Sequence, residues 1–138
     1  MQPIPYLFFN GTCAEAMAFY ASVLGTPPPE IMPFSAMPEE VRAQMPGVPA
    51  DAVMHAGLDT GDGWIYGSDD PSSEAKPMEG CNIHLSLPTP EDARRVFDAF
   101  ACGGEVRMPL EPAFWAPVFG TVSDKFGIRW MISADPQD

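Results

Sequence analysis

The sequence has few of the residues that metal sites, disulfide frameworks and nucleic-acid surfaces require. Only two histidines and three cysteines occur among its 138 residues. The odd number of cysteines and the lack of metal-ligand spacing predict a reduced, cytoplasmic protein with buried free thiols. No base stands at a recognisable offset from a cysteine, which disfavours a catalytic thiol. Seven Lys and Arg against nineteen Asp and Glu give a formal charge of −12, which argues against nucleic acid and anionic membranes as partners.

Long apolar runs are missing as well. No run approaches the length needed to span a bilayer, and no basic-then-apolar signal segment opens the chain. The length suits a single domain with a real core. Proline, by contrast, is abundant: the seventeen prolines cluster near 27–29, 46–49 and 109–117. They indicate rigid connections and edge segments between strand-like runs.

One stretch organises the rest of the chain. Residues 82–87 alternate polar and apolar side chains as a strand does, and residues 89–104 then read as a capped helix that ends at a glycine pair. Residues 5–25 repeat this order with an offset of 77, since Thr12 matches Thr89 and Tyr20 matches Phe97. The chain therefore reads as a duplicated α+β domain.

Each half is predicted to run strand, helix, strand, strand, strand. A capping box at Thr12 and Glu15 is expected to start the first helix. Loop 38–51 is either a functional cover or a surface insertion. The expected elements of the first half are strand 4–10, helix 13–24, an edge strand in 30–37 and the hairpin 53–59 with 63–68. Those of the second are strand 82–87, helix 90–102, strand 105–110 and the hairpin 114–123 with 127–134. We expect one domain over 1–138, made of tandem βαβββ modules 1–70 and 80–138, a linker at 71–79, and a sheet-lined cleft.

The polar row of the fifth expected strand, residues 82–87, is the best site candidate. If Ile83 and its alternating partners face the helix, Asn82, His84 and Ser86 point into the cleft. A buried polar group without a partner costs about 1–3 kcal/mol, so such a row favours a ligand or ordered water. His84 is either ligand-facing or satisfied by side chains of the sheet, and His55 reads more readily as a core or edge histidine.

An aromatic pair and an arginine pair are further candidates for the site. Phe114 and Trp115 cannot both be buried on one strand face, so one of them is expected to line the pocket or a subunit interface. Arg107 and Arg129 could hold an anionic group, although solvent-facing strand positions explain them equally well.

With this architecture, the chain resembles the vicinal oxygen chelate superfamily of glyoxalase I, extradiol dioxygenases and bleomycin-resistance proteins, and within it the PhnB-like group. The matching motifs are PYLFFNGTCAEAMAFY at 5–20, MHAGL at 54–58, GSDD at 67–70 and FWAPVFGTVSDKFGIRWMIS at 114–133. The last motif is the most specific, and together with residues 82–103 the motifs cover most of the chain.

The resemblance implies a site built from four strands. The metalloenzymes of the superfamily hold a divalent ion with one side chain from each, and their pattern falls here on Pro5, Tyr66, Asn82 and Met131, none of which is a His or Glu ligand. Tyr66 is therefore expected to offer a hydroxyl to the cleft. A shifted metal site that uses His84 and His55 is the alternative.

The first functional hypothesis is a homodimeric, PhnB-like protein that binds a small, partly apolar ligand without a tightly held metal. Its candidate ligand-binding residues are Tyr66, Asn82, His84, Ser86, Trp115 and His55. The alternatives are a metal-dependent lyase, isomerase or dioxygenase, and a resistance protein that sequesters a drug.

Overall fold

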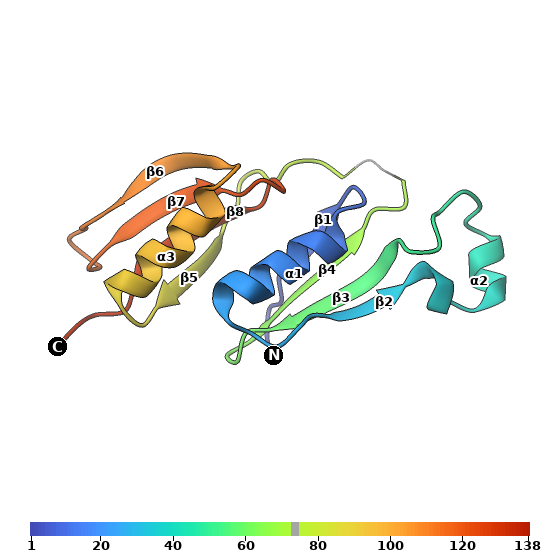
Figure 1. Cartoon of the computed structure of the whole chain (residues 1–138), viewed down its shortest axis with the longest axis horizontal. Helices are drawn as coiled ribbons and strands as arrows, with labels where there is room; N and C mark the ends of the chain where they lie inside the picture. Colours follow the sequence, from blue (N-terminus) through green and yellow to red (C-terminus); the bar gives the residue numbers. More distant parts are fainter. Residues whose placement is uncertain (73–74) are drawn as a thin grey trace. The chain divides into compact units, whose positions relative to one another are not determined.

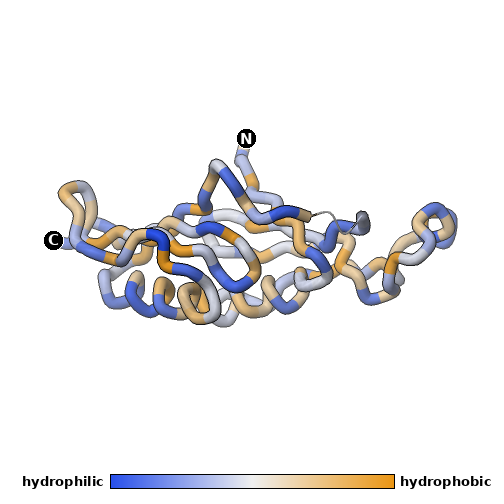
Figure 2. The backbone as a smooth tube through the Cα atoms, turned by 90° about the horizontal axis from the view of Figure 1, so that it is seen from above, coloured by the Kyte–Doolittle hydropathy of each residue, from blue (hydrophilic) through white to orange (hydrophobic). Residues whose placement is uncertain are grey.

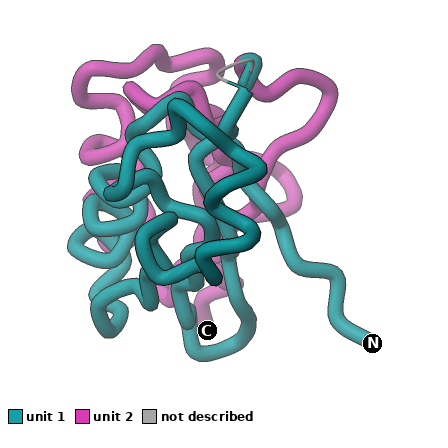
Figure 3. Tube along the Cα trace, turned by 90° about the vertical axis from the view of Figure 1, so that its right-hand side faces the viewer, with its two compact units in different colours: residues 1–76 teal, residues 77–138 magenta. Residues whose placement is uncertain are grey.

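The computed structural model describes residues 1–72 and 75–138. It divides into two compact units, residues 1–76 and residues 77–138 (Figure 3). Each unit contains one four-stranded sheet with one twelve-residue helix packed against it (Figure 1). The expected α+β fold of two βαβββ modules is confirmed.

The first unit has the strand order β1-β4-β3-β2. Strand β1 pairs with β4 in parallel, and the other pairs are antiparallel. Strand β2 is at the edge of the sheet, as Pro33 predicts. Proline has no backbone N–H to donate to a neighbouring strand, so it is tolerated mainly in edge strands. The elements are β1 (Tyr6–Phe9), α1 (Cys13–Leu24), β2 (Glu30–Pro33), η1 (Phe34–Ala36), α2 (Glu39–Ala43), β3 (Val53–Asp59) and β4 (Trp64–Asp69).

The second unit repeats this topology with the strand order β5-β8-β7-β6. Here β5 is the parallel partner of β8, and the remaining pairs are antiparallel. The elements are β5 (Ile83–Leu87), α3 (Pro90–Ala101), β6 (Glu105–Glu111), β7 (Phe119–Ser123) and β8 (Arg129–Ala134).

The core of each unit lies between its helix and one face of its sheet. In the second unit Phe100 of α3 stacks on Trp130 of β8 with ring centroids 4.6 Å apart. The predicted apolar stripe of α3 is confirmed, since all of its members are buried: Ala93, Val96, Phe97 and Phe100. In α1 the buried set is Cys13, Ala16, Met17, Tyr20, Ala21 and Val23, whereas the expected Phe19 is only half-buried.

Among the described residues, none of the helices is both long and apolar enough to pass through a bilayer. The longest of them, α1 and α3, have twelve residues, whereas a span needs about 20. Figure 2 shows hydrophilic and hydrophobic colours along the backbone.

The two helices begin in different ways. At α3 the Thr89 side chain accepts the backbone N–H of Asp92 at 3.1 Å, which confirms the expected cap. At α1 the expected capping box is wrong, because the Thr12 side chain makes no cap hydrogen bond. The carboxylate of Asp69, at the end of β4, accepts the Cys13 N–H at 3.0 Å instead, and its other oxygen accepts the Val53 N–H at 2.9 Å. One buried side chain thus fixes the starts of α1 and β3 together.

The strand expected over 114–123 is too long. Strand β7 begins only at Phe119, and residues 112–118 form a bend without regular secondary structure. Pro112 and Pro117 flank that segment, and a proline removes a ladder donor and restricts the residue before it. Phe114 consequently lies outside the sheet and is fully exposed, and Trp115 is half exposed.

A buried aspartate also organises the second unit. Asp124, in the β7–β8 turn, accepts the backbone N–H groups of Phe126 and Ile128 on one oxygen at 2.8 and 3.0 Å. Its other oxygen accepts the indole N–H of Trp130 at 2.9 Å. The Asp-x-Phe-Gly-x-x-Trp motif is therefore the turn, its clamp and the core residue that the clamp orients.

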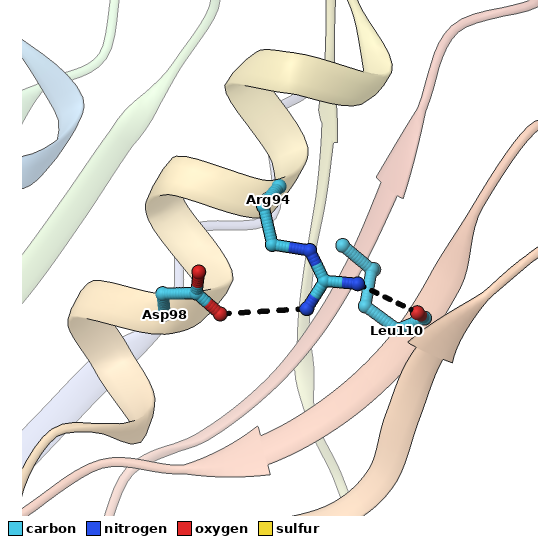
Figure 4. A network of polar contacts seen from close by, with 3 residues as sticks. All are labelled: Arg94, Asp98 and Leu110. Atoms are coloured by element: carbon cyan, nitrogen blue, oxygen red, sulfur yellow. Dashed lines mark hydrogen bonds and ion pairs between the residues drawn. The ribbon is translucent and has the colours of Figure 1, made fainter.

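Arg94 connects α3 to β6. One guanidinium nitrogen donates to the Leu110 carbonyl at 2.9 Å, and another pairs with Asp98 at 3.4 Å (Figure 4). Asp98 is mostly exposed, so its pair with Arg94 is expected to contribute less than about 1 kcal/mol.

The buried Asp124 and the exposed Asp98 give a matched test of stability. We expect Asp124→Asn to lower the free energy of unfolding by about 2–3 kcal/mol, because one amide cannot accept from both sides and its NH₂ meets another donor. Urea unfolding followed by Trp fluorescence measures the change. Asp98→Asn, which alters an exposed carboxylate, should stay within about 0.5 kcal/mol of the parent. Equal effects of the two substitutions would contradict the assigned role of Asp124.

Candidate functional site

The sheet face opposite α1, here called the helix-free face of the first sheet, is lined by aromatic rings. It comprises Tyr6, Phe8, His55, Trp64 and Tyr66. The ring of His55 lies 4.8 Å from that of Tyr66 in an edge-to-face arrangement, and Tyr6 lies 5.3 Å from Phe8. The Tyr6 hydroxyl is 3.2 Å from Nδ1 of His55.

Strand alternation places these rings together. Leu7 and Phe9 of β1 are buried toward α1, so Tyr6 and Phe8 point the other way. Tyr6 is paired in register with Tyr66 on β4, and Tyr66 is paired with Gly57 on β3. A Cβ at Gly57 would lie 3.3 Å from the Trp64 ring and 3.5 Å from that of Tyr66, so glycine gives the two rings room beside β3.

The helix-free face of the second sheet is mainly polar. Three cross-strand rows on this face follow from the register. They are Ser86, Ser133 and Phe119; then His84, Met131, Thr121 and Met108; then Arg129, Ser123 and Glu105. The alternate residues Trp130, Ile132 and Val122 are fully buried, which identifies the opposite face as the one packed on α3.

The predicted polar row of β5 is placed on this face and is engaged by its neighbours. His84 Nε2 is 2.8 Å from the hydroxyl of Ser133, and the Ser86 hydroxyl donates to the Asp135 carboxylate. The Asn82 amide oxygen accepts from the Arg107 guanidinium at 2.5 Å. Each member therefore has a protein partner.

Arg107 and Arg129 give this face its charge. Arg107 Nε donates to the Ser123 hydroxyl at 3.1 Å, and Ser123 is directly opposite Arg129. Burial, and next the neighbouring positive charge of Arg129, lower the pKa of Arg107, while Glu105 has a smaller opposing effect. The two guanidinium groups thus share one end of the face.

Trp115 is on the loop before β7 rather than on a strand. Its ring centroid lies 4.7 Å from that of Phe119, which belongs to the helix-free face of the second sheet. Of the expected pair, Trp115 thus contacts this face, and Phe114 extends into solvent.

A separate pocket of about 280 Å³ lies in the first unit. Segment 47–49 of the long loop lines it together with Asp51, Asp69 and Asp70. Both Asp69 oxygens already accept backbone N–H groups, and Asp70 accepts from Ser72. Two of the three acidic side chains that line the pocket, Asp69 and Asp70, therefore already accept hydrogen bonds from neighbouring residues.

Comparison with known proteins identifies the family. Residues 4–132 match the Glyoxalase/Bleomycin resistance protein/Dioxygenase superfamily. The chain belongs to this superfamily. Among curated relatives, Protein YjdN of Escherichia coli (strain K12) is 33% identical over 144 residues, covering 96% of this chain and 95% of YjdN.

Two solved structures are similar to this chain over nearly its whole length. Protein PA1353 from Pseudomonas aeruginosa is 39% identical with a TM-score of 0.87, and the match covers 99% of each chain. A PhnB protein from Bacillus cereus is 24% identical with a TM-score of 0.77, covering 98% of this chain and 100% of that one. The second likeness shows the shared fold alone.

The residues at the superfamily's metal-ligand positions do not fit a divalent ion. Pro5 has no side-chain donor, Met131 offers only a thioether, and the Asn82 oxygen accepts from a cationic guanidinium. Within residues 1–72 and 75–138, no group of three or more His, Cys, Asp or Glu side chains is arranged to hold a metal. No chemical step is therefore assigned to a metal at these positions.

Some residues of these faces were not singled out as candidates from sequence. Tyr6 has the right alternation, but only the position of α1 shows which of its faces is helix-free. Ser133 and Thr121 lie in a strongly apolar motif, and their role depends on cross-strand register, which a single sequence does not reveal.

The expectation of buried thiols is correct for one cysteine only. Cys13 is fully buried, whereas Cys81 and Cys102 are exposed, and all three are free. Burial, with a smaller contribution from the Asp69 charge, raises the pKa of Cys13 to about 12. Cys13 is thus a core residue and not a nucleophile.

This difference predicts selective labelling. At pH 8 the folded protein should react with a thiol reagent such as DTNB at two cysteines per chain, and in denaturant at three. The folded-state pKa of Cys13 is raised, so its contribution to stability is present below about pH 9 and declines as the pH rises toward 12. Rapid reaction of all three thiols in the folded protein would contradict the burial of Cys13, and Cys13→Ala identifies the protected residue.

Proposed function

We propose that the protein binds a small, partly apolar molecule on the helix-free faces of its sheets, without a tightly held metal. The observation that carries this proposal is the aromatic lining of the first of these faces. Tyr6 is 43% exposed and Phe8 is 57% exposed, although both belong to a strand of the sheet. Clustered exposed aromatic side chains of this kind mark ligand-binding or interaction surfaces.

The chemistry of the two faces supports such a ligand. Aromatic rings supply contact area and edge-to-face or offset stacking for an apolar moiety. The hydroxyl of Tyr6 and the imidazole of His55, which already interact, provide a polar group that can orient it. The helix-free face of the second sheet, taken by itself, is a second candidate binding surface, with the polar groups of His84, Ser86 and Asn82 and the aromatic pair Trp115 and Phe119.

We also propose that the protein acts as a homodimer in the cytoplasm. The fully exposed Phe114 is an apolar group that a second copy would cover, and free exposed thiols are typical of a reducing compartment. Sedimentation velocity at twice the 14.9 kDa chain mass would support the dimer, and a monomer at all concentrations would contradict it.

The test of ligand binding uses 2-naphthol, a neutral aromatic alcohol, as a probe. We expect binding at millimolar or lower concentrations by isothermal titration calorimetry, and about 3–10-fold weaker binding to Tyr66→Ala, because a stacked ring contributes about 0.5–1.5 kcal/mol. Ile31→Ala removes an exposed apolar side chain of the edge strand β2, on the α1 side of the sheet, and should bind like the parent.

Two results would contradict the proposal. The first is no binding of 2-naphthol, or equal weakening by both substitutions. The second is elemental analysis of the purified protein that finds one zinc, nickel or iron per chain, which would overturn the metal-free part.

A further inference from the structure

In the part of the chain that the structure describes, Arg107 and Arg129 of the second unit have no carboxylate partner. The chain has only seven Lys and Arg residues and a formal charge of −12. Within the described part of the chain, the ion pairs recorded for arginines are those of Arg94 with Asp98 and Arg95 with Asp92. Arg107 and Arg129 have none, although acidic side chains outnumber basic ones almost three to one.

Their neighbours bring them close together. Arg107 donates to Ser123, and Ser123 is directly opposite Arg129 across β7 and β8. Directly opposed residues of an antiparallel pair have Cβ atoms about 4.5–5.5 Å apart. Glu105, in the same row, is exposed and makes no ion pair with either guanidinium in the described structure.

At this arginine pair, two buried polar atoms have no hydrogen-bond partner among the described residues. They are Nε of Arg129 and Oγ1 of Thr121, the only such side-chain atoms found in the part of the chain that the structure describes. Thr121 is 5% exposed and points to the same face as Ser123, two residues along β7. Buried polar groups are normally paired, and each unpaired one calls for an explanation.

Resting on the part of the proposed function that concerns the second sheet, we propose that the helix-free face of this sheet binds a ligand with an anionic oxygen group, a carboxylate or a phosphate, through Arg129, Arg107 and Thr121. An anion would compensate two adjacent positive charges and accept from both unpaired donors. Guanidinium groups bind carboxylate and phosphate through paired N–H donors, and charge-assisted hydrogen bonds are roughly twice as strong as neutral ones.

The surroundings fit a small aromatic or branched acid. Met131 is opposite Thr121 on β8, and Phe119 is two residues from Thr121 on β7, with the Trp115 ring against it. Two residues of a strand span about 6.6 Å, so an apolar group on Phe119 and an anion at Thr121 belong to a ligand of one or two rings. Asn82 and Ser123 hold Arg107 in place and act as positioning residues.

Three matched probes test the assignment by isothermal titration calorimetry: 2-naphthol, 2-naphthoate and 2-naphthyl phosphate. We expect at least one of the two anions to bind about tenfold or more tightly than the neutral alcohol, since a hydrogen bond to a charged group is lost in the alcohol. The stronger of the two anions identifies the source as carboxylate or phosphate. Arg129→Gln should remove the advantage of the anion and leave 2-naphthol binding unchanged.

Two controls keep the test specific. Arg95→Gln makes the same charge change on the exposed surface of α3 and should preserve the advantage of the anion. Thr121→Val removes the unpaired hydroxyl with little change in shape, so we expect anion binding to weaken several-fold while the melting temperature does not fall.

The outcomes separate the inference from the proposed function. If 2-naphthol binds but neither anion binds more tightly, or if the advantage survives in Arg129→Gln and Thr121→Val, the anion site is overturned and the binding function stands. If none of the three probes binds, both are overturned.

Discussion

The structure depends on the fact that each four-stranded sheet is packed against one twelve-residue helix. A helix of this length spans about 18 Å and covers one face of a small sheet. In the central strands of each sheet the apolar alternate positions are committed to that face, as Trp130 and Ile132 show in β8. The other face is left with the residues that the core does not use. These are aromatic in the first unit and polar in the second, and the proposed binding function follows from this difference.

In each unit one buried aspartate fixes the ends of neighbouring elements. Asp69 ends β4 and accepts N–H groups from the first residues of α1 and β3, and Asp124 closes the β7–β8 turn and holds the Trp130 indole. The two units share a topology but place their clamps differently. In the second unit the Asp124 turn immediately precedes Arg129, so the side chain that fixes the core also fixes the strand end that carries the proposed anion contact.

The elements with local signals could be predicted from the sequence. Alternation in β5, the Thr89 cap and the apolar stripe of α3 depend on neighbours a few residues apart, and all three are confirmed. The position of α1 was predicted correctly, but its cap could not be predicted, because the cap is a carboxylate 56 residues from Cys13. Alternation alone groups Asn82, His84 and Ser86 on one face of β5, and the family resemblance points to Tyr66. The pairing of Asn82 with Arg107 depends on register between distant strands and could not be predicted. The strand predicted from Phe114 begins only at Phe119, because Pro112 and Pro117 prevent regular strand pairing there despite the apolar pattern.

The proposed binding of a small anionic ligand to the helix-free face of the second sheet has one most direct test. This test is a map of backbone amide chemical shifts by NMR during titration with 2-naphthoate. We predict the largest changes in β7 and β8, with Thr121 and Arg129 among them, and small changes in the exposed turns of α3. Changes confined to segment 47–52 around the acidic pocket, or to the helices, would contradict the account.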